Sequence, residues 1–368
     1  MYPETFEGFC VQSHKNWSDF KSLEFTPKPF EEHDVDVSVE CCSICGSDIH
    51  TLTGGWGPKG FPLCVGHEIV GEVITVGALV TLCKVGDRVG VGAQVLSCFD
   101  CKACKTGNEN YCAKRIGTYG VKYSDGVMSQ GGFASHIRVH EHYTVPIPDG
   151  LPSSAVAPLM CAGVSVFGPL RRANIGPGSK VAVLGIGGLG HLALQFARAL
   201  GAEVFALSHS SNKEQDAIAC GAHHFILTST ENWHKPLQYE FDFIMNTVDV
   251  AHTFNLLEYF STLRIHGTFH FVGIPDAPFP DLKAFNLLFL RTGANIAGSH
   301  IGSRSEMVSM LEVAKEHGIR AWVEEIQLGE QGCKKAVERL SINDARFRFT
   351  LVGYDRAFPK RVSKASIE

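Results

Sequence analysis

The sequence lacks any uninterrupted run of the roughly 18 apolar residues that a membrane-spanning helix requires, so we do not expect an integral membrane protein. It also lacks a long basic run, and its formal net charge is -5 at pH 7. Both features disfavour nucleic acid or an acidic membrane surface as the main partner. Internal repeats and low-complexity tracts are absent too. We therefore expect a globular protein that binds a small neutral or anionic molecule.

A secretory signal is also missing from Met1–Trp17, which contains neither a basic stretch nor an apolar stretch. The chain nevertheless contains 13 cysteines. In the reducing cytosol, cysteines remain thiols or bind metal rather than form a disulfide framework. We therefore expect a cytoplasmic protein whose cysteines are thiols or metal ligands.

The 368 residues change character along the chain, which predicts two domains. Up to about Pro158, short runs such as Val35–Val39 alternate apolar and polar residues with period two, as in an irregular, mostly β domain. From about Lys180, strands alternate with glycine turns and helices, which indicates an open parallel sheet of the doubly wound type. The run Phe347–Val352 could return to the first domain. The tail after Tyr354 is polar, and we expect it to be loose.

Four cysteines stand close together in the pattern C-x2-C-x2-C-x7-C. They are Cys98, Cys101, Cys104 and Cys112. Four thiolates close a tetrahedral zinc site that has no open position, as in structural zinc lobes. An iron–sulfur cluster is the main competitor, but in the ferredoxin motif the fourth cysteine follows after three residues and precedes proline. Here the gap is seven residues and Ala113 follows, so a structural zinc site is predicted.

A glycine-rich turn follows the expected strand Val181–Leu184 and opens an expected helix. Its G-x-G-x-x-G pattern comprises Gly185, Gly187, Gly188, Leu189 and Gly190, together with Ile186. Glycines at these points let the chain turn tightly and let a pyrophosphate approach the helix N-terminus. A helix-packing glycine cluster is the alternative, but the surrounding strand–helix–strand pattern favours dinucleotide binding.

The end of the next strand selects the coenzyme, because an acidic residue there would bind the ribose hydroxyls and repel a 2′-phosphate. The chain instead carries Ser208, His209, Ser210, Ser211, Asn212 and Lys213. Small hydroxyls and a lysine suit a dianionic phosphate, so NADP(H) is predicted rather than NAD(H). Ser210 or Ser211 could at the same time cap the following helix.

Two segments of the first region, Cys45–His50 and Gly66–Glu68, concentrate further metal-binding side chains. A cysteine, a histidine and a second cysteine would leave zinc one open position for a substrate oxygen. Spacing alone leaves this undecided, since Cys45 or His67 taken singly is more often an ordinary core or surface residue.

In this order, C-G-S-D-I-H at residues 45–50, G-H-E-I-V-G at residues 66–71 and the four-cysteine lobe resemble the zinc-containing medium-chain alcohol dehydrogenases. The similarity is strongest to the cinnamyl alcohol dehydrogenase branch, in particular to NADPH-dependent yeast enzymes of broad aldehyde specificity. It extends from Phe6 to Asp355. The resemblance implies a mostly β, GroES-like catalytic domain at residues 1–162 and 300–368, and a doubly wound Rossmann domain for the cofactor at residues 163–299. It also implies a homodimer joined through the cofactor-domain sheets.

The same resemblance implies two zinc ions per chain, one structural and one catalytic. The implied ligands of the catalytic zinc are Cys45, His67 and Cys161, with Glu68 as an exchangeable fourth. Without the resemblance, Cys161 would be interpreted as a buried helix cysteine.

Three polar residues of the first motif receive roles by the same comparison. Asp48 is expected to accept a hydrogen bond from His67 and so fix its ring. Ser47 is expected to pass the alcohol proton towards His50. Without the motif, Ser47 would be a turn-stabilising hydroxyl and His50 a surface imidazole.

Further cofactor contacts are implied for Gly273 (within Val272–Pro275), Ser299, Ile301 and Arg348. The resemblance implies that Arg348 lies near the pyrophosphate and the catalytic glutamate, and the alternative is a surface cation beside Asp344. The similar yeast enzymes carry arginine where this chain has His209, and histidine cannot bind phosphate as a bidentate fork. The preference for NADPH could therefore be weaker, or depend on pH.

Leu52, Trp56 and Phe61 are expected beside an apolar substrate slot, with simple packing inside the domain as an equal alternative. The predicted function is interconversion of primary alcohols and aldehydes, aromatic or medium aliphatic, with zinc and NADP(H). A second hypothesis is an NAD-dependent polyol or secondary-alcohol dehydrogenase on the same fold. A third, of another class, is a non-catalytic protein that binds zinc and nucleotide, which the complete set of zinc-site residues disfavours.

Overall fold

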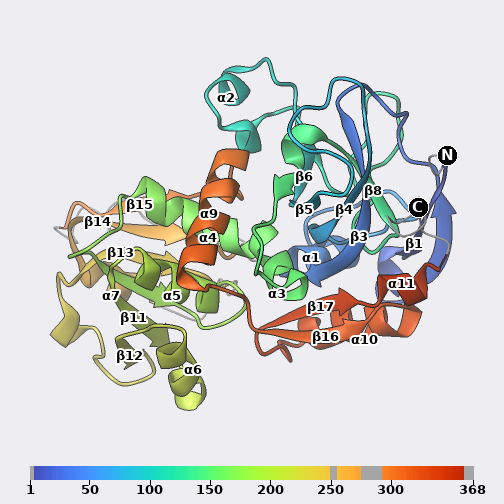
Figure 1. Ribbon diagram of the computed structural model, residues 1–368. Helices are drawn as coiled ribbons and strands as arrows, with labels where there is room; N and C mark the ends of the chain where they lie inside the picture. The colour runs from blue at the N-terminus through green and yellow to red at the C-terminus, as the bar shows by residue number, and fades with distance from the viewer. Residues whose placement is uncertain (1–3, 249–254, 275–291, 360–368) are drawn as a thin grey trace. The chain divides into compact units, whose positions relative to one another are not determined.

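The computed structural model describes residues 4–248, 255–274 and 292–359, and the chain divides into two compact units (Figure 1). Unit 1 comprises Met1–Ala162, Ile301–Lys315 and Arg320–Glu368. Unit 2 comprises Gly163–His300 and Glu316–Ile319. Each unit has its own sheet and its own apolar core.

Unit 1 is mostly β, as predicted. Its main sheet has seven strands in the order β16-β17-β3-β4-β5-β9, with β8 paired to β3. The strands are β3 (Asp34–Ile44), β4 (Glu68–Val76), β5 (Arg88–Val91), β8 (His136–His140), β9 (Val145–Pro146), β16 (Val323–Gln327) and β17 (Arg348–Val352). The pair β1 (Phe6–Cys10) and β2 (Lys21–Phe25) and the pair β6 (Gln94–Leu96) and β7 (Ile116–Gly117) form two smaller sheets. Val35, Val37 and Val39 of β3 are fully buried in the apolar core of unit 1, and the polar residues between them, Asp36 and Ser38, are buried as well.

Short helices connect the strands of unit 1, and several predicted metal ligands lie in them or directly beside them. They are α1 (Gly46–Thr53), α2 (Lys102–Lys105), η2 (Glu109–Tyr111), η3 (Glu141–Tyr143), α3 (Ser153–Val156) and η4 (Ala157–Met160). Helix α1 begins directly after β3, and the Asp48 carboxylate in its first turn accepts a hydrogen bond from the Cys45 N–H at 2.9 Å. It ends at Gly54, whose φ of 81° is the left-handed conformation that glycine favours at a helix end.

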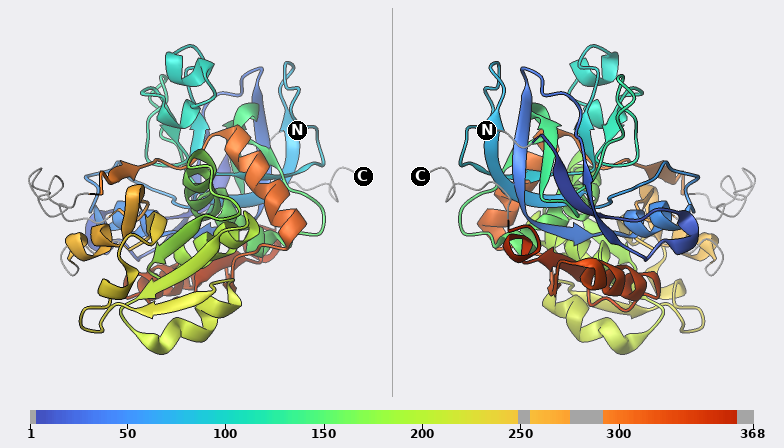
Figure 2. Two further views of the ribbon diagram at one scale, coloured as in Figure 1. Left: turned by 90° about the vertical axis from the view of Figure 1, so that its left-hand side faces the viewer. Right: turned by 90° about the vertical axis from the view of Figure 1, so that its right-hand side faces the viewer.

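The C-terminal part of the chain lies beside the N-terminal strands of unit 1 (Figure 2, right). It contains α9 (Arg304–His317), α10 (Glu330–Ser341) and α11 (Tyr354–Ala357). Strand β17 pairs antiparallel with β3, so Phe349 lies opposite Ile44. The prediction of a loose tail after Tyr354 is wrong for the first residues, because α11 is helical and Phe358 is buried with its ring centroid 5.3 Å from that of Phe9. Apolar burial outweighs the polar composition of this segment.

Unit 2 is the predicted doubly wound sheet, with six parallel strands in the order β12-β11-β10-β13-β14-β15. The strands are β10 (Lys180–Leu184), β11 (Glu203–Ser208), β12 (His224–Leu227), β13 (Phe241–Asn246), β14 (Leu263–Phe271) and β15 (Asn295–Gly298). Among the described residues of this unit, the helices are α4 (Ala162–Arg172), α5 (Gly190–Ala199), α6 (Glu214–Ala219) and α7 (Leu256–Ser261). The strand order reverses between β10 and β13, and sheets of this type bind ligands beyond the carboxyl ends of the strands at that point.

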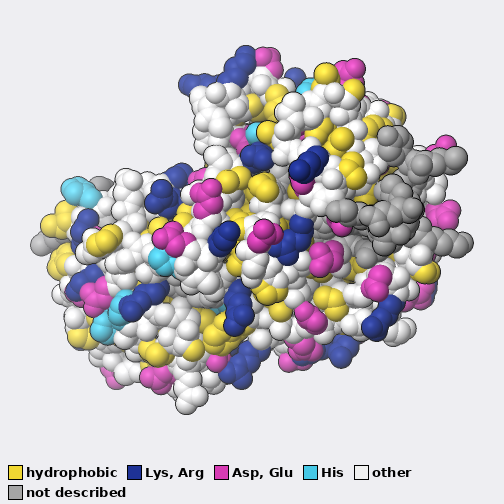
Figure 3. Space-filling model, in the orientation of Figure 1, with side chains coloured by type: hydrophobic (Ala, Val, Ile, Leu, Met, Phe, Trp, Pro, Cys, Tyr) yellow, Lys and Arg dark blue, Asp and Glu magenta, His cyan; other side chains and the backbone are white. Residues whose placement is uncertain are grey.

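Within the described part of the chain, no single helix has the length and hydropathy to cross a membrane, although the bent pair Ser153–Met160 and Ala162–Arg172 passes by length and composition only. On the face drawn in Figure 3, positive and negative side chains are interspersed.

Candidate functional site

The four cysteines of the lobe converge around one point in unit 1. Their sulfur atoms all lie within 4.8 Å of one another. The Sγ–Sγ distances are 3.9 Å for Cys98–Cys104, 3.5 Å for Cys101–Cys104 and 3.5 Å for Cys98–Cys112. Thiolates about 2.3 Å from a tetrahedral zinc lie roughly 3.8 Å apart, so the lobe fits a closed zinc site.

Within the lobe, the charged form is favoured at Cys98. Hydrogen bonds from the backbone N–H groups of Asp100 and Cys101 lower the pKa of Cys98 to about 6. A thiolate is the form that binds metal. The chain around Cys98 therefore prepares it for zinc.

The second predicted ligand set also converges. Cys45 lies between β3 and α1, His67 and Glu68 lie at the start of β4, and Cys161 lies between η4 and α4. One ligand atom of each residue lies within 4.8 Å of the others. His67 and Glu68 are buried, Cys161 is 7% exposed, and Cys45 is half-buried. Two sulfurs, an imidazole and a carboxylate at this spacing fit a zinc site with an exchangeable position.

Asp48 holds the imidazole of this cluster, as its place in the motif implied. Its carboxylate is fully buried and accepts hydrogen bonds from Nδ1 of His67 at 3.0 Å and from the Gly66 N–H at 3.1 Å. Since Nδ1 is used in this way, Nε2 of His67 is left for a metal.

Glu68 forms a buried ion pair with Arg348. Oε2 of Glu68 contacts Nη2 of Arg348, and Oε1 accepts a hydrogen bond from the Ala162 N–H at 3.4 Å. Burial raises the pKa of Glu68 to about 7, although Arg348 opposes the shift. Arg348 is only 5% exposed, and Asp344 pairs with Arg339 instead. The alternative of a surface cation beside Asp344 is therefore wrong.

Ser47 and His50 lie in α1 beside the cluster. The Cys45 thiol lies 3.6 Å from Oγ of Ser47, within hydrogen-bonding distance for sulfur. The His50 ring stacks on Trp56, with ring centroids 4.7 Å apart. Proton transfer from Ser47 to His50 stays a prediction.

The three expected substrate residues have different environments. Leu52 is fully buried in the unit 1 core, which matches the packing alternative. Trp56 is 41% exposed, and Phe61 packs against the core with its ring edge-on to His14. Trp56 is the best remaining candidate for a substrate contact in unit 1.

The glycine-rich turn of unit 2 leaves room where a pyrophosphate is expected. Gly185 has φ 90°, and a Cβ there would lie 2.4 Å from Val248. A Cβ at Gly190 would lie 1.9 Å from the Gly185 carbonyl oxygen. A Cβ at Gly187, by contrast, would meet nothing within 4 Å among the described residues. Two glycines thus shape the turn, and the third faces open space at the start of α5.

The segment after β11 is ordered by its own hydroxyls. Oγ of Ser208 donates a hydrogen bond to the Ser210 carbonyl oxygen at 2.9 Å. Lys213 also contacts the glycine turn, because its Nζ donates a hydrogen bond to the Ile186 carbonyl oxygen at 2.9 Å. His209 is exposed. Ser210 occupies the N-cap position of η5 (Ser211–Lys213) without a capping hydrogen bond from its side chain, so the capping hypothesis is wrong for Ser210.

The remaining predicted cofactor residues are constrained by their backbone or by neighbours. A Cβ at Gly273 would lie 2.2 Å from the Val248 carbonyl oxygen, which explains the glycine. Oγ of Ser299 lies 3.0 Å from Nε2 of His270, and Ile301 has φ 42°. Pro275, the last residue of the predicted Val272–Pro275 segment, lies outside the described residues.

Sequence reasoning missed Tyr119, whose ring centroid lies 5.6 Å from that of His67. Burial and the nearby Asp48 carboxylate raise the pKa of Tyr119, so the phenol stays neutral beside the cluster. The surrounding loop carries no metal-binding pattern that could have identified this residue.

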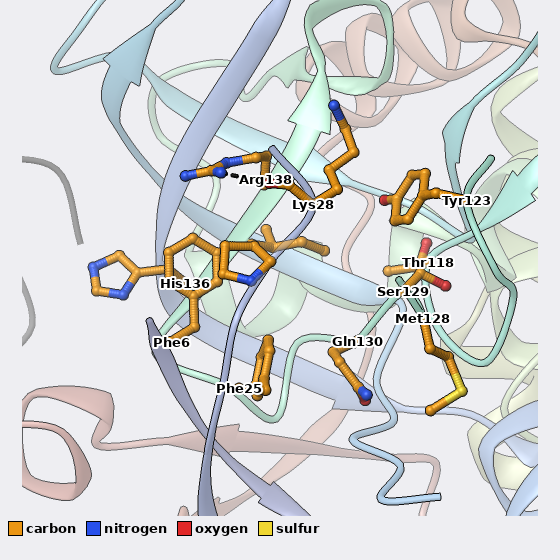
Figure 4. Close-up of a pocket in the computed structure, with 12 residues that line it drawn as sticks. Phe6, Phe25, Lys28, Thr118, Tyr123, Met128, Ser129, Gln130, His136 and Arg138 are labelled. Atoms are coloured by element: carbon orange, nitrogen blue, oxygen red, sulfur yellow. Dashed lines mark hydrogen bonds between the residues drawn. The ribbon is translucent and has the colours of Figure 1, made fainter. Parts of the chain in front are cut away.

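A separate small pocket of unit 1 lies beside β1, β2 and β8 (Figure 4). Two cations line it, and both already have partners. Lys28 pairs with Asp34 at 2.5 Å, and Arg138 pairs with Asp36 at 2.8 Å. The residues that line this pocket include no member of the four-cysteine lobe and none of Cys45, His67, Glu68 and Cys161. The pocket is therefore distinct from both candidate metal sites.

Similarity to known proteins covers both units. Residues 31–149 match the family described as "Alcohol dehydrogenase GroES-like domain", and residues 188–316 match "Zinc-binding dehydrogenase". The chain is 43% identical to NADP-dependent alcohol dehydrogenase 6 of Saccharomyces cerevisiae, over 97% of this chain and 99% of that protein.

Solved structures are similar over the same extent. A cinnamyl alcohol dehydrogenase of Sorghum bicolor is 35% identical with a TM-score of 0.88, over 95% of this chain and 97% of the other. The enzyme titled CAD from Helicobacter pylori, solved with NADP(H), is 32% identical with a TM-score of 0.87, over 95% of this chain and 98% of the other. The chain belongs to the zinc-containing alcohol dehydrogenase family, as its motifs predicted.

Proposed function

We propose that this zinc-dependent, NADP-dependent alcohol dehydrogenase acts mainly as a reductase of aromatic and medium aliphatic aldehydes. The single observation that carries the proposal is the buried cluster of Cys45, His67, Glu68 and Cys161 with Asp48 behind the imidazole. A closed structural zinc site would need neither a carboxylate that can leave the metal, as Glu68 could, nor an imidazole oriented by a second carboxylate, as His67 is by Asp48. The yeast and sorghum relatives, whose names state alcohol and cinnamyl alcohol dehydrogenases, support the same substrate class.

The roles of the residues follow from this assignment. When bound, zinc supplies a Lewis acid that acidifies an alcohol or polarises an aldehyde, and NADP(H) supplies the hydride acceptor or donor. Asp48 fixes His67 in the tautomer that offers Nε2. Arg348 compensates the charge of Glu68, so the carboxylate can remain near the metal or move from it without an unpaired buried charge. Ser47 and His50 are the proposed route for the proton.

The second unit is the proposed cofactor domain. Gly185, Gly187, Gly188, Leu189 and Gly190 form the turn for the pyrophosphate. Ser208, His209 and Lys213 are proposed to bind the 2′-phosphate. Lys213 would exchange its contact with the Ile186 carbonyl for the phosphate, which costs little because the carbonyl is a neutral acceptor.

One assay series tests the proposal. Zinc content is measured first, followed by steady-state reduction of cinnamaldehyde, benzaldehyde, hexanal and a ketose with NADPH and with NADH. We expect two zinc ions per chain and reduction of the aldehydes with NADPH. Preferred reduction of the ketose with NADH would support a polyol dehydrogenase instead, and two zinc ions without turnover would support a non-catalytic protein.

We further propose a homodimer through the edge of the unit 2 sheet. Strand β15 is the last strand of that sheet among the described residues, and Ile296 on it is 38% exposed. Ile265 on the neighbouring β14 is 61% exposed. An edge with apolar side chains favours pairing with a second copy. Light scattering should give twice the chain mass, and Ile296→Lys should lower it.

A cytoplasmic location is proposed as well. All 13 cysteines are free of disulfide bonds, and a reducing compartment keeps thiols and zinc thiolates intact. Cell fractionation with a tagged chain tests this location.

A further inference from the structure

A buried carboxylate of the four-cysteine lobe contacts the first turn of α9. Glu109 lies in η2 between Cys104 and Cys112 and is 4% exposed. Its Oε1 accepts a hydrogen bond from the backbone N–H of Arg304 at 2.7 Å and lies 3.1 Å from Nε2 of His142. Arg304 is the first residue of α9, and in Figure 1 the upper end of α9 lies just below the lobe that carries α2.

The start of α9 is capped from two directions. The first N–H groups of a helix have no partner within the helix. Ser303 and Glu306 supply a local capping box, since the Ser303 N–H donates to Glu306 at 2.9 Å and the Glu306 N–H donates to Oγ of Ser303 at 3.4 Å. Glu109 satisfies the Arg304 N–H from outside the helix and places a carboxylate at its positive end. The lobe therefore adds a second cap to the start of α9.

The segment before α9 holds a costly backbone conformation. Ile301 has φ 42°, and a β-branched residue in the left-handed region persists only when its surroundings hold the chain. Ser299 contacts His270 within unit 2, and Arg304 is held by Glu109 within unit 1. The segment Ser299–Ser303 is thus anchored at both ends.

The lobe is itself suited to serve as an anchor. Gln94 donates from Nε2 to the Glu109 carbonyl oxygen at 3.1 Å and to the Tyr143 hydroxyl at 2.8 Å. The two flanking cysteines, Cys104 and Cys112, are candidate ligands of one metal. The backbone of Glu109 is therefore held by contacts that do not involve α9.

We propose that Glu109 is a positioning residue through which the four-cysteine zinc lobe holds Ser299–Ser303 in the conformation that receives the cofactor. The proposal rests on the proposed function and on the NADP(H) contacts that the family resemblance implies for Ser299 and Ile301. It gives the structural zinc a second task besides folding: to keep the carboxylate of Glu109 at the start of α9.

Glu109→Gln tests the carboxylate, and Glu312→Gln, at an exposed position of α9, is its matched control. We measure three quantities in each variant: the zinc content, the hydrogen-exchange rate of a peptide covering residues 299–308, and the NADPH dissociation constant by fluorescence. We expect two zinc ions, roughly tenfold faster exchange and a roughly tenfold larger dissociation constant for Glu109→Gln, since a charge-assisted hydrogen bond is weakened. At saturating NADPH, kcat should stay within about twofold.

A second pair of variants isolates the backbone hydrogen bond. Arg304→Pro removes the N–H at a helix position where proline is favoured, whereas Arg304→Ala keeps the N–H and removes only the side chain. We expect the proline variant to match Glu109→Gln and the alanine variant to resemble the unaltered protein.

Four results would each overturn the proposal. In Glu109→Gln these are an unchanged hydrogen-exchange rate, loss of zinc, or faster exchange with unchanged NADPH affinity. The fourth is an equal defect in both Arg304 variants. An unaltered protein that fails to bind NADPH would contradict the proposed function instead. In that case the exchange measurements still decide whether Glu109 anchors the segment.

Discussion

The Asp48 carboxylate accepts a hydrogen bond from Nδ1 of His67 at 3.0 Å, and this one contact determines which imidazole nitrogen faces Cys45 and Cys161. Asp48→Asn should weaken zinc binding at this cluster by about 10- to 100-fold, because a neutral amide no longer fixes the tautomer or raises the basicity of the ring. Chelator competition measures this affinity. Asp19→Asn, at an exposed position, is the control, and equal zinc affinity in both variants would contradict the role of Asp48.

The two cysteine clusters should respond differently to the same substitution. Cys104→Ser should remove one zinc ion and lower the melting temperature by roughly 5–10 °C, because the lobe loses its cross-link. Cys45→Ser should abolish turnover in a protein that remains folded. Calorimetry, metal analysis and activity assays distinguish the two, with the half-buried Cys83→Ser as a control for the change of thiol to hydroxyl. The reverse pattern would show that the roles are exchanged.

Coenzyme selectivity should change at the end of β11. Ser208 is 7% exposed there, and its hydroxyl organises the backbone of Ser210. Ser208→Asp should shift the ratio of kcat/KM values towards NADH by about tenfold or more, because a carboxylate repels the 2′-phosphate and accepts ribose hydroxyls. Ser229→Asp, at an exposed site of the same unit, should leave the ratio unchanged. Equal efficiencies with both coenzymes in the unaltered protein would argue against a phosphate site here.

Acid should weaken unit 2 through His270. Burial, with a smaller effect of Arg172, lowers the pKa of His270 to about 4. A histidine that is harder to protonate when folded stabilises the fold fully above its unfolded pKa of about 6.5, and the contribution is lost as the pH falls towards 4. The loss amounts to up to about 3 kcal/mol of unfolding free energy. His270→Gln should therefore lose less stability between pH 6.5 and pH 4 than the unaltered protein.

Denaturant unfolding at several pH values measures this difference. His317→Gln, at an exposed histidine, should retain the full acid dependence. Parallel pH curves for His270→Gln and the unaltered protein would rule out this contribution.

Local patterns identified the parts of the protein that are built from neighbouring residues. The four lobe cysteines lie within one short loop, so their spacing already restricts where their sulfurs can meet. The turn from Gly185 to Gly190 is likewise local, because a strand, a tight turn and a helix start follow one another directly. The alternation of apolar and polar residues at Val35–Val39 indicated a strand for the same reason.

The second cluster shows why sequence reasoning was incomplete there. Cys161 carries no metal-binding spacing of its own, and only its resemblance to a family suggested that it joins Cys45 and His67. Arg348 and Glu68 are 280 positions apart, and only the resemblance suggested that this arginine lies near the catalytic glutamate, while the nearby Asp344 offered a local alternative. Tyr119 gave no signal at all.

The sequence by itself determined the two-part β and doubly wound architecture, the closed thiolate lobe and the dinucleotide turn, because each arises from periodicity or spacing within a few turns of chain. Only the tertiary structure decided that Arg348 compensates Glu68, that Phe358 is buried, and that Glu109 caps a helix 195 positions away. These contacts depend on strand pairing and on burial, which make distant charges and apolar rings neighbours and which no local pattern specifies.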